Sequence, residues 1–210
     1  MNASEELNRR LSECPLVAII RGVTPDDAEA IGAALWENGI RIIEVPLNSP
    51  RPLDSISRLA ESLGDRALVG AGTVLEPEQV AAVRDAGGRL IVSPDTREAV
   101  IEAAVAAGMV STPGYFTPSE AFRALRAGAH GLKFFPAEAA SPAAVKAQKA
   151  VLPPGVPLLV VGGVRPDSMR AWLDAGAAGF GLGSGLYKPG RSAEETAACA
   201  RDYVEGLRGR

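Results

Sequence analysis

One lysine of the sequence lies in an otherwise apolar run, where its amine could react with a carbonyl compound. Lys133 is at the centre of the segment HGLKFFP. A charged ammonium in a buried strand costs a large desolvation free energy unless the side chain faces a polar site. Apolar walls from Phe134 or Phe135, and a neighbouring cation such as Arg21, would lower the pKa of the lysine and leave a neutral amine, the nucleophile that forms a Schiff base. The other three lysines fall on predicted helix surface or in a loop: Lys146, Lys149 and Lys188.

Glu44 could supply the proton transfers that Schiff-base chemistry needs. It lies in the segment IIEVP, whose apolar side chains would raise the pKa of its carboxyl group toward the range of a general acid or base. Structural alternatives stay open for both residues. Lys133 could form an ion pair with Glu44 or clamp a phosphate, and Glu44 could serve to neutralise Arg21.

Glycine-rich turns in the last part of the sequence indicate a phosphate site. Gly162 and Gly163 follow one apolar run, and Gly183 and Ser184 follow the next. Backbone amides bind phosphate in many barrels of parallel strands, and the last two strands commonly carry this site. Glycines are also ordinary turn residues, so the prediction depends on the two turns together. The segment GAGT, which ends at Thr73, could likewise offer amide and hydroxyl donors to a carboxylate.

The elements that must position these residues are repeated βα units. Short β-branched runs alternate with alanine-rich amphipathic stretches along the whole sequence. The predicted strands are residues 16–20, 40–45, 67–71, 89–93, 109–112, 130–134, 157–161 and 178–182. The predicted helices are residues 25–38, 50–63, 77–87, 97–107, 117–127, 141–151, 166–175 and 192–207, preceded by a leading helix at 1–14. Four of these helices begin where a hydroxyl residue precedes a proline, a favourable N-terminal cap: Thr24, Ser49, Thr117 and Ser141.

Eight such units are the number that closes a (β/α)8 barrel. Near-continuous apolar strands such as LLVV suit a parallel sheet that is covered on both faces. An open doubly wound sheet is the alternative, but it usually has one glycine-rich fingerprint after its first strand, where this chain has RGVT. We therefore expect residues 1–210 to form a single α/β domain, a TIM barrel with an N-terminal leading helix. Its active site would lie at the C-terminal ends of the strands, where Arg21, Glu44 and Lys133 fall.

The composition argues against several classes of function. The chain has 22 basic and 25 acidic side chains, a net charge of −3, and its basic residues are scattered, so we expect no nucleic-acid partner. No apolar run approaches the roughly 20 residues that span a bilayer, and the N-terminal segment does not read as a signal sequence. We therefore expect a cytoplasmic protein without a membrane partner. Cys14 and Cys199 are expected to be buried thiols, and with the single His130 they are too few for a metal site.

Five strings of the sequence together resemble the KDPG/KDPGal aldolase family. They are AIIRG, IEVPLNSP, GAGTV, LKFFP and VGGV, and they occur in matching order from about residue 15 to about residue 190. The resemblance implies a class I aldolase that cleaves 2-dehydro-3-deoxy-6-phospho-sugar acids to pyruvate and D-glyceraldehyde 3-phosphate. It implies no metal or organic cofactor, and it implies a homotrimer.

The resemblance also implies roles for individual residues. Lys133 matches the Schiff-base lysine of the family, and Glu44 matches its general acid or base. Arg21 and Thr73 would help to hold the carboxylate end that becomes pyruvate. Four of the remaining matched residues would surround the phosphate: Gly162, Gly163, Gly183 and Ser184. The other two, Pro94 and Phe135, would flank the pocket.

Residues 46–49 indicate one branch of this family. Many phosphogluconate-type members have TLRT after the glutamate, whereas this chain has PLNS, which resembles the phosphogalactonate branch. Loss of an arginine there changes how the polar groups of the substrate are contacted. We therefore expect 2-dehydro-3-deoxy-6-phosphogalactonate as the substrate, with its C4 epimer, 2-dehydro-3-deoxy-6-phosphogluconate, as the alternative. A phosphosugar isomerase or epimerase, or a phosphate sensor without catalysis, would use the same barrel and the same glycine turns.

Overall fold

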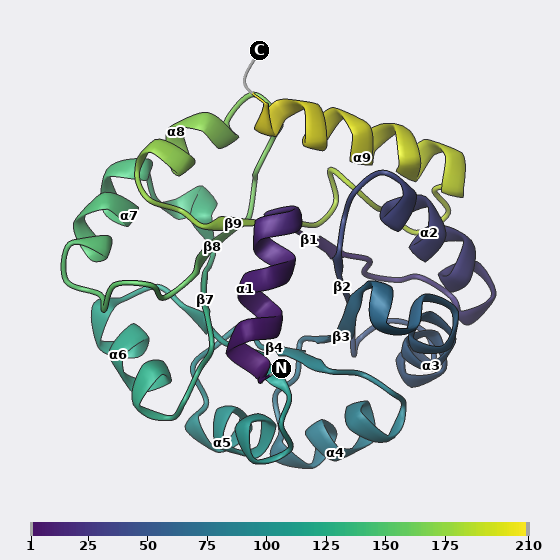
Figure 1. The fold of residues 1–210 in the computed structure, drawn as a ribbon, viewed down its shortest axis with the longest axis horizontal. Helices are drawn as coiled ribbons and strands as arrows, with labels where there is room; N and C mark the ends of the chain where they lie inside the picture. Colours follow the sequence, from purple (N-terminus) through teal and green to yellow (C-terminus); the bar gives the residue numbers. More distant parts are fainter. Residues whose placement is uncertain (1, 209–210) are drawn as a thin grey trace.

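The computed structural model describes residues 2–208, which form a barrel of parallel strands surrounded by helices (Figure 1). The strands are β1 (Leu16–Ile19), β2 (Ile42–Pro46), β3 (Leu68–Gly72), β4 (Leu90–Val92), β5 (Val110–Thr112), β6 (Gly114–Tyr115), β7 (Leu132–Phe134), β8 (Leu158–Val161) and β9 (Gly179–Leu182). Their order in the sheet is β5-β4-β3-β2-β1-β9-β8-β7-β6. The expected (β/α)8 barrel is confirmed.

All of the predicted helices are present, with bounds that lie within three residues of the expected ones. They are α1 (Ala3–Glu13), α2 (Pro25–Glu37), α3 (Pro52–Leu63), α4 (Pro77–Asp85), α5 (Glu98–Ala106), α6 (Pro118–Arg126), α7 (Pro142–Lys149), α8 (Met169–Asp174) and α9 (Ala193–Leu207). Two short 3-10 helices are added at Gly64–Arg66 and Ala137–Ala139. Within residues 2–208, none of the helices is long and apolar enough to cross a membrane.

The predicted fifth strand is present as β5, but the fifth position of the barrel also holds a short strand that was not predicted, β6, which Pro113 separates from β5. β5 pairs with β4, and β6 pairs with β7. The two edges are nevertheless joined, since the amide of Lys133 donates to the carbonyl of Pro113 at 2.9 Å and the amide of His130 donates to the carbonyl of Ser111 at 2.9 Å. Proline has no N–H to give to the sheet, which explains the interruption. These backbone bonds close the barrel.

Alternation along the strands divides the buried side chains into an outer and an inner set. In β2, Ile43 and Val45 belong to a cluster that includes the apolar faces of the helices, whereas Ile42 belongs to a second cluster within the barrel. The inner cluster is made of Leu7, Leu11, Val17, Ile42, Leu68, Leu90, Val92, Val110 and Leu159. Its members come mostly from the first residues of the strands, so apolar side chains fill the N-terminal half of the barrel.

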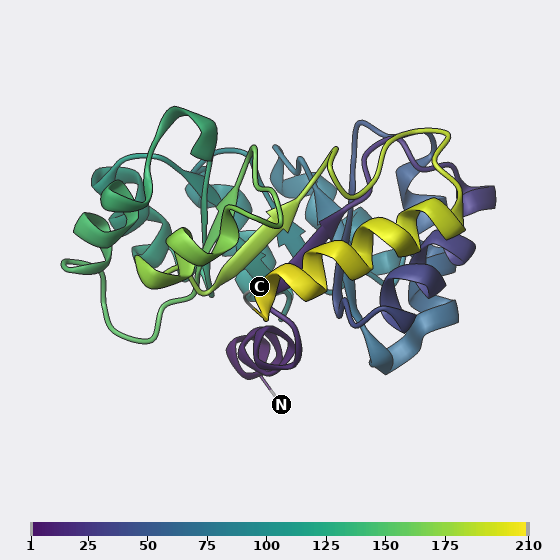
Figure 2. The same ribbon diagram turned by 90° about the horizontal axis from the view of Figure 1, so that it is seen from above.

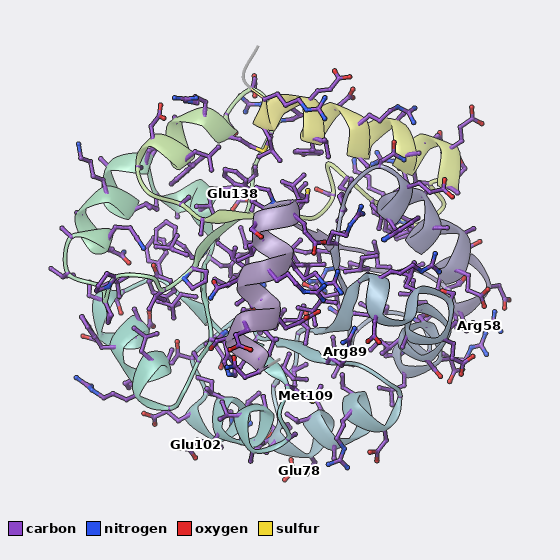
Figure 3. The ribbon with its side chains drawn as sticks, in the orientation of Figure 1. Arg58, Glu78, Arg89, Glu102, Met109 and Glu138 are labelled. Carbon is purple, nitrogen blue, oxygen red and sulfur yellow. The ribbon has the colours of Figure 1, made fainter. Side chains whose placement is uncertain are left out.

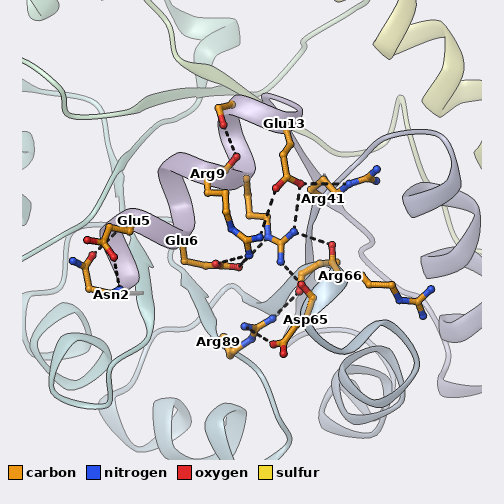
Figure 4. Close-up of polar contacts among 12 residues, drawn as sticks. Asn2, Glu5, Glu6, Arg9, Glu13, Arg41, Asp65, Arg66 and Arg89 are labelled. Carbon is orange, nitrogen blue, oxygen red and sulfur yellow. Dashed lines mark hydrogen bonds and ion pairs between the residues drawn. The ribbon is translucent and has the colours of Figure 1, made fainter.

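Helix α1 covers the N-terminal end of the barrel (Figure 2). Leu7 of this helix packs into the inner cluster. Arg10 is 3% exposed, and its guanidinium pairs with Glu6 at 2.9 Å and donates to the carbonyl of Arg66 at 3.0 Å and to that of Asp65 (Figure 4). A buried guanidinium requires this many acceptors because its desolvation is costly. Helix α1 therefore closes the N-terminal end of the barrel, so we expect a polar site at the C-terminal end.

The predicted helix caps are confirmed in part. Thr24 and Thr117 cap α2 and α6 through their hydroxyl oxygens. Ser141 precedes α7 but makes no capping hydrogen bond. The prediction for Ser49 is wrong, because Arg51 is the residue that precedes α3. The Ser49 hydroxyl instead accepts a hydrogen bond from a backbone amide of the loop after β1, at 2.9 Å.

Candidate active site

Two ionisable side chains face the interior of the barrel near the C-terminal ends of their strands. Because Ile43 and Val45 belong to the outer cluster, alternation turns Glu44 inward. Both neighbours of Lys133 in β7 also belong to the outer cluster, so Lys133 is turned inward as well. The fold thus brings together the two residues that the sequence singled out for chemistry.

Lys133 lies in an apolar environment with one aromatic contact. Its side chain is 8% exposed, and its ammonium nitrogen is 5.0 Å from the centre of the Phe135 ring. Burial lowers the pKa of Lys133; the charge of Glu44 raises this pKa, and the charge of Arg21 lowers it. The lowered pKa increases the fraction of neutral amine, which is the form that attacks a carbonyl carbon.

Glu44 is the more deeply buried partner, with an exposed fraction of 2%. Burial raises the pKa of its carboxyl group to about 7, although the positive charges of Lys133 and Arg21 oppose this shift. Within residues 2–208, its Oε2 atom has no hydrogen-bond partner. A carboxyl group with a pKa near neutrality can both donate and accept a proton, as a general acid and base must.

Gly72 leaves the space that the Glu44 carboxyl group occupies. A Cβ atom at Gly72 would overlap both carboxyl oxygens of Glu44. The backbone of Gly72 is not in the left-handed region, so an alanine there would be unfavourable because of the carboxyl group and not because of its φ angle. Gly72, the second glycine of the GAGT segment, thus allows the Glu44 carboxyl group to lie at this position.

We expect Gly72→Ala to lower kcat about 100-fold with little change in KM, because a methyl group displaces the Glu44 carboxyl group by about 1 Å or more. Steady-state kinetics and a thermal melt check this. The melt separates a displaced carboxyl group from loss of folding, since Gly72 has no positive φ at which an alanine would add backbone strain. Full activity of folded Gly72→Ala would show that the position of the carboxyl group is not critical.

Arg21 is oriented by two polar side chains from neighbouring loops. Its Nη1 donates to the side-chain oxygen of Asn48, and its Nη2 lies 3.4 Å from the hydroxyl oxygen of Thr73. Thr73 has a φ of 56°, an uncommon conformation for a β-branched residue, and such strain is typical of functional sites. Asn48 had no assigned role in the sequence, and the structure places it as one of the two residues that orient Arg21.

Nine of the ten predicted site residues line one cavity of about 390 Å³. These residues are Arg21, Thr73, Pro94, Lys133, Phe135, Gly162, Gly163, Gly183 and Ser184. Glu44 is the remaining one, and it is buried behind the cavity wall, close enough to Lys133 for their charges to interact. Loops from most of the strands meet here, as expected for the C-terminal end of this fold.

Three further polar residues line the cavity and were missed by the sequence interpretation: Glu138, Tyr187 and Lys188. The sequence placed Lys188 among the lysines of helix surfaces and loops without a part in the site, and its place on the cavity wall corrects this. The available signal was the segment GSGLYKPG, whose glycines and proline indicate a folded loop directly after a predicted phosphate turn.

Several other polar or reactive side chains have structural surroundings instead. The Nδ1 atom of His130 accepts a hydrogen bond from a backbone amide of β5 at 3.0 Å. Tyr115 is buried with its ring against a phenylalanine of β7. Cys14 is buried as expected, but Cys199 is partly exposed, so that expectation is wrong for the second thiol. Within residues 2–208, no group of three His, Cys, Asp or Glu side chains is arranged to hold a metal ion.

Residues 7–199 match the protein family described as KDPG and KHG aldolase. The chain belongs to the KDPG and KHG aldolase family. One relative, the 2-dehydro-3-deoxy-6-phosphogalactonate aldolase of Escherichia coli K12, is 49% identical to this chain over 197 residues. These residues cover 94% of this chain and 96% of the relative. The family resemblance inferred from the five sequence strings is therefore confirmed.

Solved structures resemble this KDPG and KHG aldolase over nearly its whole length. One described as native KDPGal superimposes with a TM-score of 0.92 at 49% identity and covers 93% of this chain and 95% of its own. A KDPG aldolase from Legionella pneumophila, with pyruvate captured as a covalent carbinolamine, has a TM-score of 0.80 at 26% identity and covers 94% of this chain and 97% of its own.

Proposed function

We propose that this protein is a class I aldolase that cleaves 2-dehydro-3-deoxy-6-phosphogalactonate to pyruvate and D-glyceraldehyde 3-phosphate. The observation that carries the proposal is the inward-facing pair of Lys133 and Glu44 beside the cavity. Burial lowers the pKa of the amine, which increases its neutral fraction, and raises the pKa of the carboxyl group to about 7, where it can both donate and accept a proton. The Legionella relative supports the chemistry, because a carbinolamine is the adduct of an amine with a ketone.

The first half of the proposed reaction forms an electron sink on the substrate. The neutral amine of Lys133 attacks the C2 ketone and gives a carbinolamine. Glu44 donates a proton to the carbinolamine hydroxyl group, which leaves as water, and an iminium ion remains. The positive nitrogen of the iminium then withdraws electrons from the bond between C3 and C4.

The second half breaks the carbon–carbon bond. The Glu44 carboxylate accepts the proton of the C4 hydroxyl group, the electrons of the C3–C4 bond move into an enamine, and D-glyceraldehyde 3-phosphate leaves as the aldehyde. The enamine then takes a proton at C3. Water hydrolyses the resulting iminium, which releases pyruvate and the free amine of Lys133, so the water lost in the first half is regained here.

The two ends of the cavity fit the two charged ends of the substrate. Arg21, oriented by Asn48 and Thr73, offers a cation to the carboxylate that becomes part of pyruvate. The backbone turns at Gly162 and Gly183 offer N–H groups to the phosphate, as glycine turns commonly do. A substrate bound between them has its C2 carbonyl near Lys133.

The choice between the two C4 epimers rests on the segment PLNS after Glu44 and on the relative from Escherichia coli. In this segment, Asn48 contacts Arg21 and carries no charge of its own. A neutral amide meets the hydroxyl groups of the sugar acid differently from the arginine of the phosphogluconate type. The gluconate epimer remains the alternative substrate, since both epimers give the same two products.

Pyruvate release from the two epimeric phospho-acids, followed with lactate dehydrogenase and NADH, tests the proposed function. We expect a higher kcat/KM for the galactonate epimer and turnover that is insensitive to EDTA. Turnover with isomerisation and no pyruvate would favour an isomerase or epimerase. A higher kcat/KM for the gluconate epimer would keep the aldolase chemistry but refute the proposed specificity.

We further propose that the protein acts in the cytoplasm as a homotrimer. The trimer rests on the family resemblance, and the cytoplasmic location rests on the composition of the sequence. Light scattering of the purified protein tests the trimer directly.

A further inference from the structure

We infer that Lys188 binds the phosphate group of the substrate and determines how strongly the protein prefers phosphorylated sugar acids over unphosphorylated ones. The inference rests on the proposed function, because it assigns a residue to the phosphate end of the same cavity. Lys188 lies on the cavity wall a few residues after Gly183 and Ser184, which form one of the two glycine turns.

The loop that carries Lys188 is held in place on both sides of this residue. Before it, Leu186 and Tyr187 are buried, and their amides donate to the carbonyl of Gly183 at 2.9 and 3.0 Å. After it, the amide of Arg191 donates to the carbonyl of Lys188 at 3.0 Å. The Arg191 guanidinium also donates to the carbonyl of Leu186 at 2.8 Å. The backbone is thus fixed at the cavity.

The next residue, Pro189, connects this loop to the loop after the neighbouring strand β1. A Cβ atom at Gly22 would lie 2.6 Å from the Pro189 ring, so the two loops are in close contact. Gly22 follows Arg21 directly. Lys188 is therefore placed between the glycine turn after β9 and the loop that carries the arginine of the site.

Of the cationic side chains that line the cavity, Lys188 is the one available to bind a phosphate. Three cationic side chains line the cavity: Arg21, Lys133 and Lys188. Arg21, which Asn48 and Thr73 orient, is assigned to the carboxylate of the substrate, and Lys133 must be neutral for attack. Within residues 2–208, Lys188 has no ion pair or side-chain hydrogen bond, and it is exposed at the cavity mouth. It is the cation that is free to meet a dianion.

The cavity wall also carries a carboxylate, Glu138, whose repulsion of a phosphate Lys188 would compensate. Glu138 lies against both glycines of the turn after β8, since a Cβ at Gly162 or Gly163 would overlap its side chain. In the view of Figure 3, Glu138 lies near β8 and β9, inside the ring of helices, and its side chain is exposed. Its negative charge opposes a phosphate at the turn. Without Lys188, this repulsion would not be compensated.

The test compares Lys188→Gln, Glu138→Gln and the double variant on the phosphorylated sugar acid and on the same acid without its phosphate. We expect Lys188→Gln to raise KM for the phosphorylated acid about tenfold, with kcat within about twofold, and to leave kcat/KM for the unphosphorylated acid unchanged. Glu138→Gln is expected to lower KM for the phosphorylated acid about twofold. The double variant should lie between the single ones.

Matched surface variants and a charge-conserving variant serve as controls. Lys146→Gln removes an exposed charge on α7, and Glu102→Gln removes one on α5 (Figure 3). Both residues lie outside the cavity, so both variants should behave as wild type. Lys188→Arg should keep the preference for the phosphorylated acid. An equal loss of kcat/KM on both acids for Lys188→Gln would indicate a structural role and overturn the inference.

A binding measurement separates failure of this inference from failure of the proposed function. Calorimetry with inorganic phosphate needs no turnover, and we expect a Kd for Lys188→Gln about tenfold above that of wild type. If wild type cleaves neither acid, the proposed function fails, while this ratio still decides the role of Lys188. Equal Kd values for the two proteins would show that Lys188 does not contact phosphate.

Discussion

Lys133→Met is expected to lower kcat by at least about 10⁴-fold and to abolish the covalent capture of pyruvate. Methionine has the length of the lysine stem but no amine, so neither a carbinolamine nor an iminium can form. The loss should appear in kcat for every phospho-acid that wild type cleaves. Substrate binding should persist, because Arg21 and the glycine turns are unchanged.

Reduction with borohydride in the presence of pyruvate measures the covalent step directly. Wild type should gain one pyruvate-derived group, which peptide mass spectrometry places on Lys133. Lys133→Met should gain none, and Lys146→Met, an exposed lysine on α7, should react as wild type does. A Lys133→Met protein that still captures pyruvate would refute the assignment of the nucleophile.

Lys133→Met is also expected to fold at least as stably as wild type. The lysine is 8% exposed, and burial lowers its pKa, which means that the folded protein holds the ammonium at a free-energy cost. Replacing a buried charge with an apolar side chain of similar volume is often neutral or stabilising. A thermal melt of the two proteins checks this and shows that lost activity does not arise from unfolding.

Glu44→Gln is expected to lower kcat about 10³-fold, because glutamine cannot exchange protons with the reacting groups. Lys133 is retained, so borohydride capture of pyruvate should persist at a reduced rate. This outcome distinguishes Glu44 from the nucleophile. Wild-type kcat in Glu44→Gln would show that the proton transfers are carried by another group.

The same residue predicts a pH dependence of stability. Burial raises the pKa of Glu44 to about 7 from its ordinary value of 4.5. Between these two values the folded protein binds more protons than the unfolded chain, so the free energy of unfolding falls as pH rises through this window and is constant above it. The contribution amounts to about 3 kcal/mol across the window.

The cleanest measurement of this effect uses the Lys133→Met protein with and without Glu44→Gln, since the lysine then no longer titrates. Removing the lysine charge takes away an interaction that lowers the pKa of Glu44, so the pH effect persists or grows. Denaturant unfolding at pH 5 and pH 8 should show a stability gain for the glutamine variant that is about 3 kcal/mol larger at pH 8. Parallel stability curves would contradict the raised pKa.

The barrel and its reactive pair were predictable because both depend on local patterns. The alternation of apolar runs with amphipathic stretches specifies the βα units, and their number indicates closure. A lysine or glutamate within a run such as IIEVP must face a polar space, since its neighbours face the core and a buried charge is costly. The glycine turns follow from their position after the seventh and eighth predicted strands.

The division of the fifth strand at Pro113 and the misassigned cap at Ser49 needed the tertiary structure. The Ser49 hydroxyl accepts a hydrogen bond from an amide of the loop after β1, which is distant in sequence. A proline after a hydroxyl residue indicates a helix start, but it does not reveal such a competing donor. The local sequence therefore predicted a helix start near Ser49, but it could not predict which donor the Ser49 hydroxyl accepts a hydrogen bond from.

What the sequence by itself determined is the set of residues that lie at strand ends, because strand periodicity decides which side chains face inward. Only the tertiary structure decided which loop residues join them. Lys188 reaches the cavity because Pro189 packs near Gly22 and Arg191 holds the loop backbone. Asn48 orients Arg21 through a contact between two loops. Loops have no periodicity, and their shape depends on contacts with distant segments, so sequence alone could not place these residues.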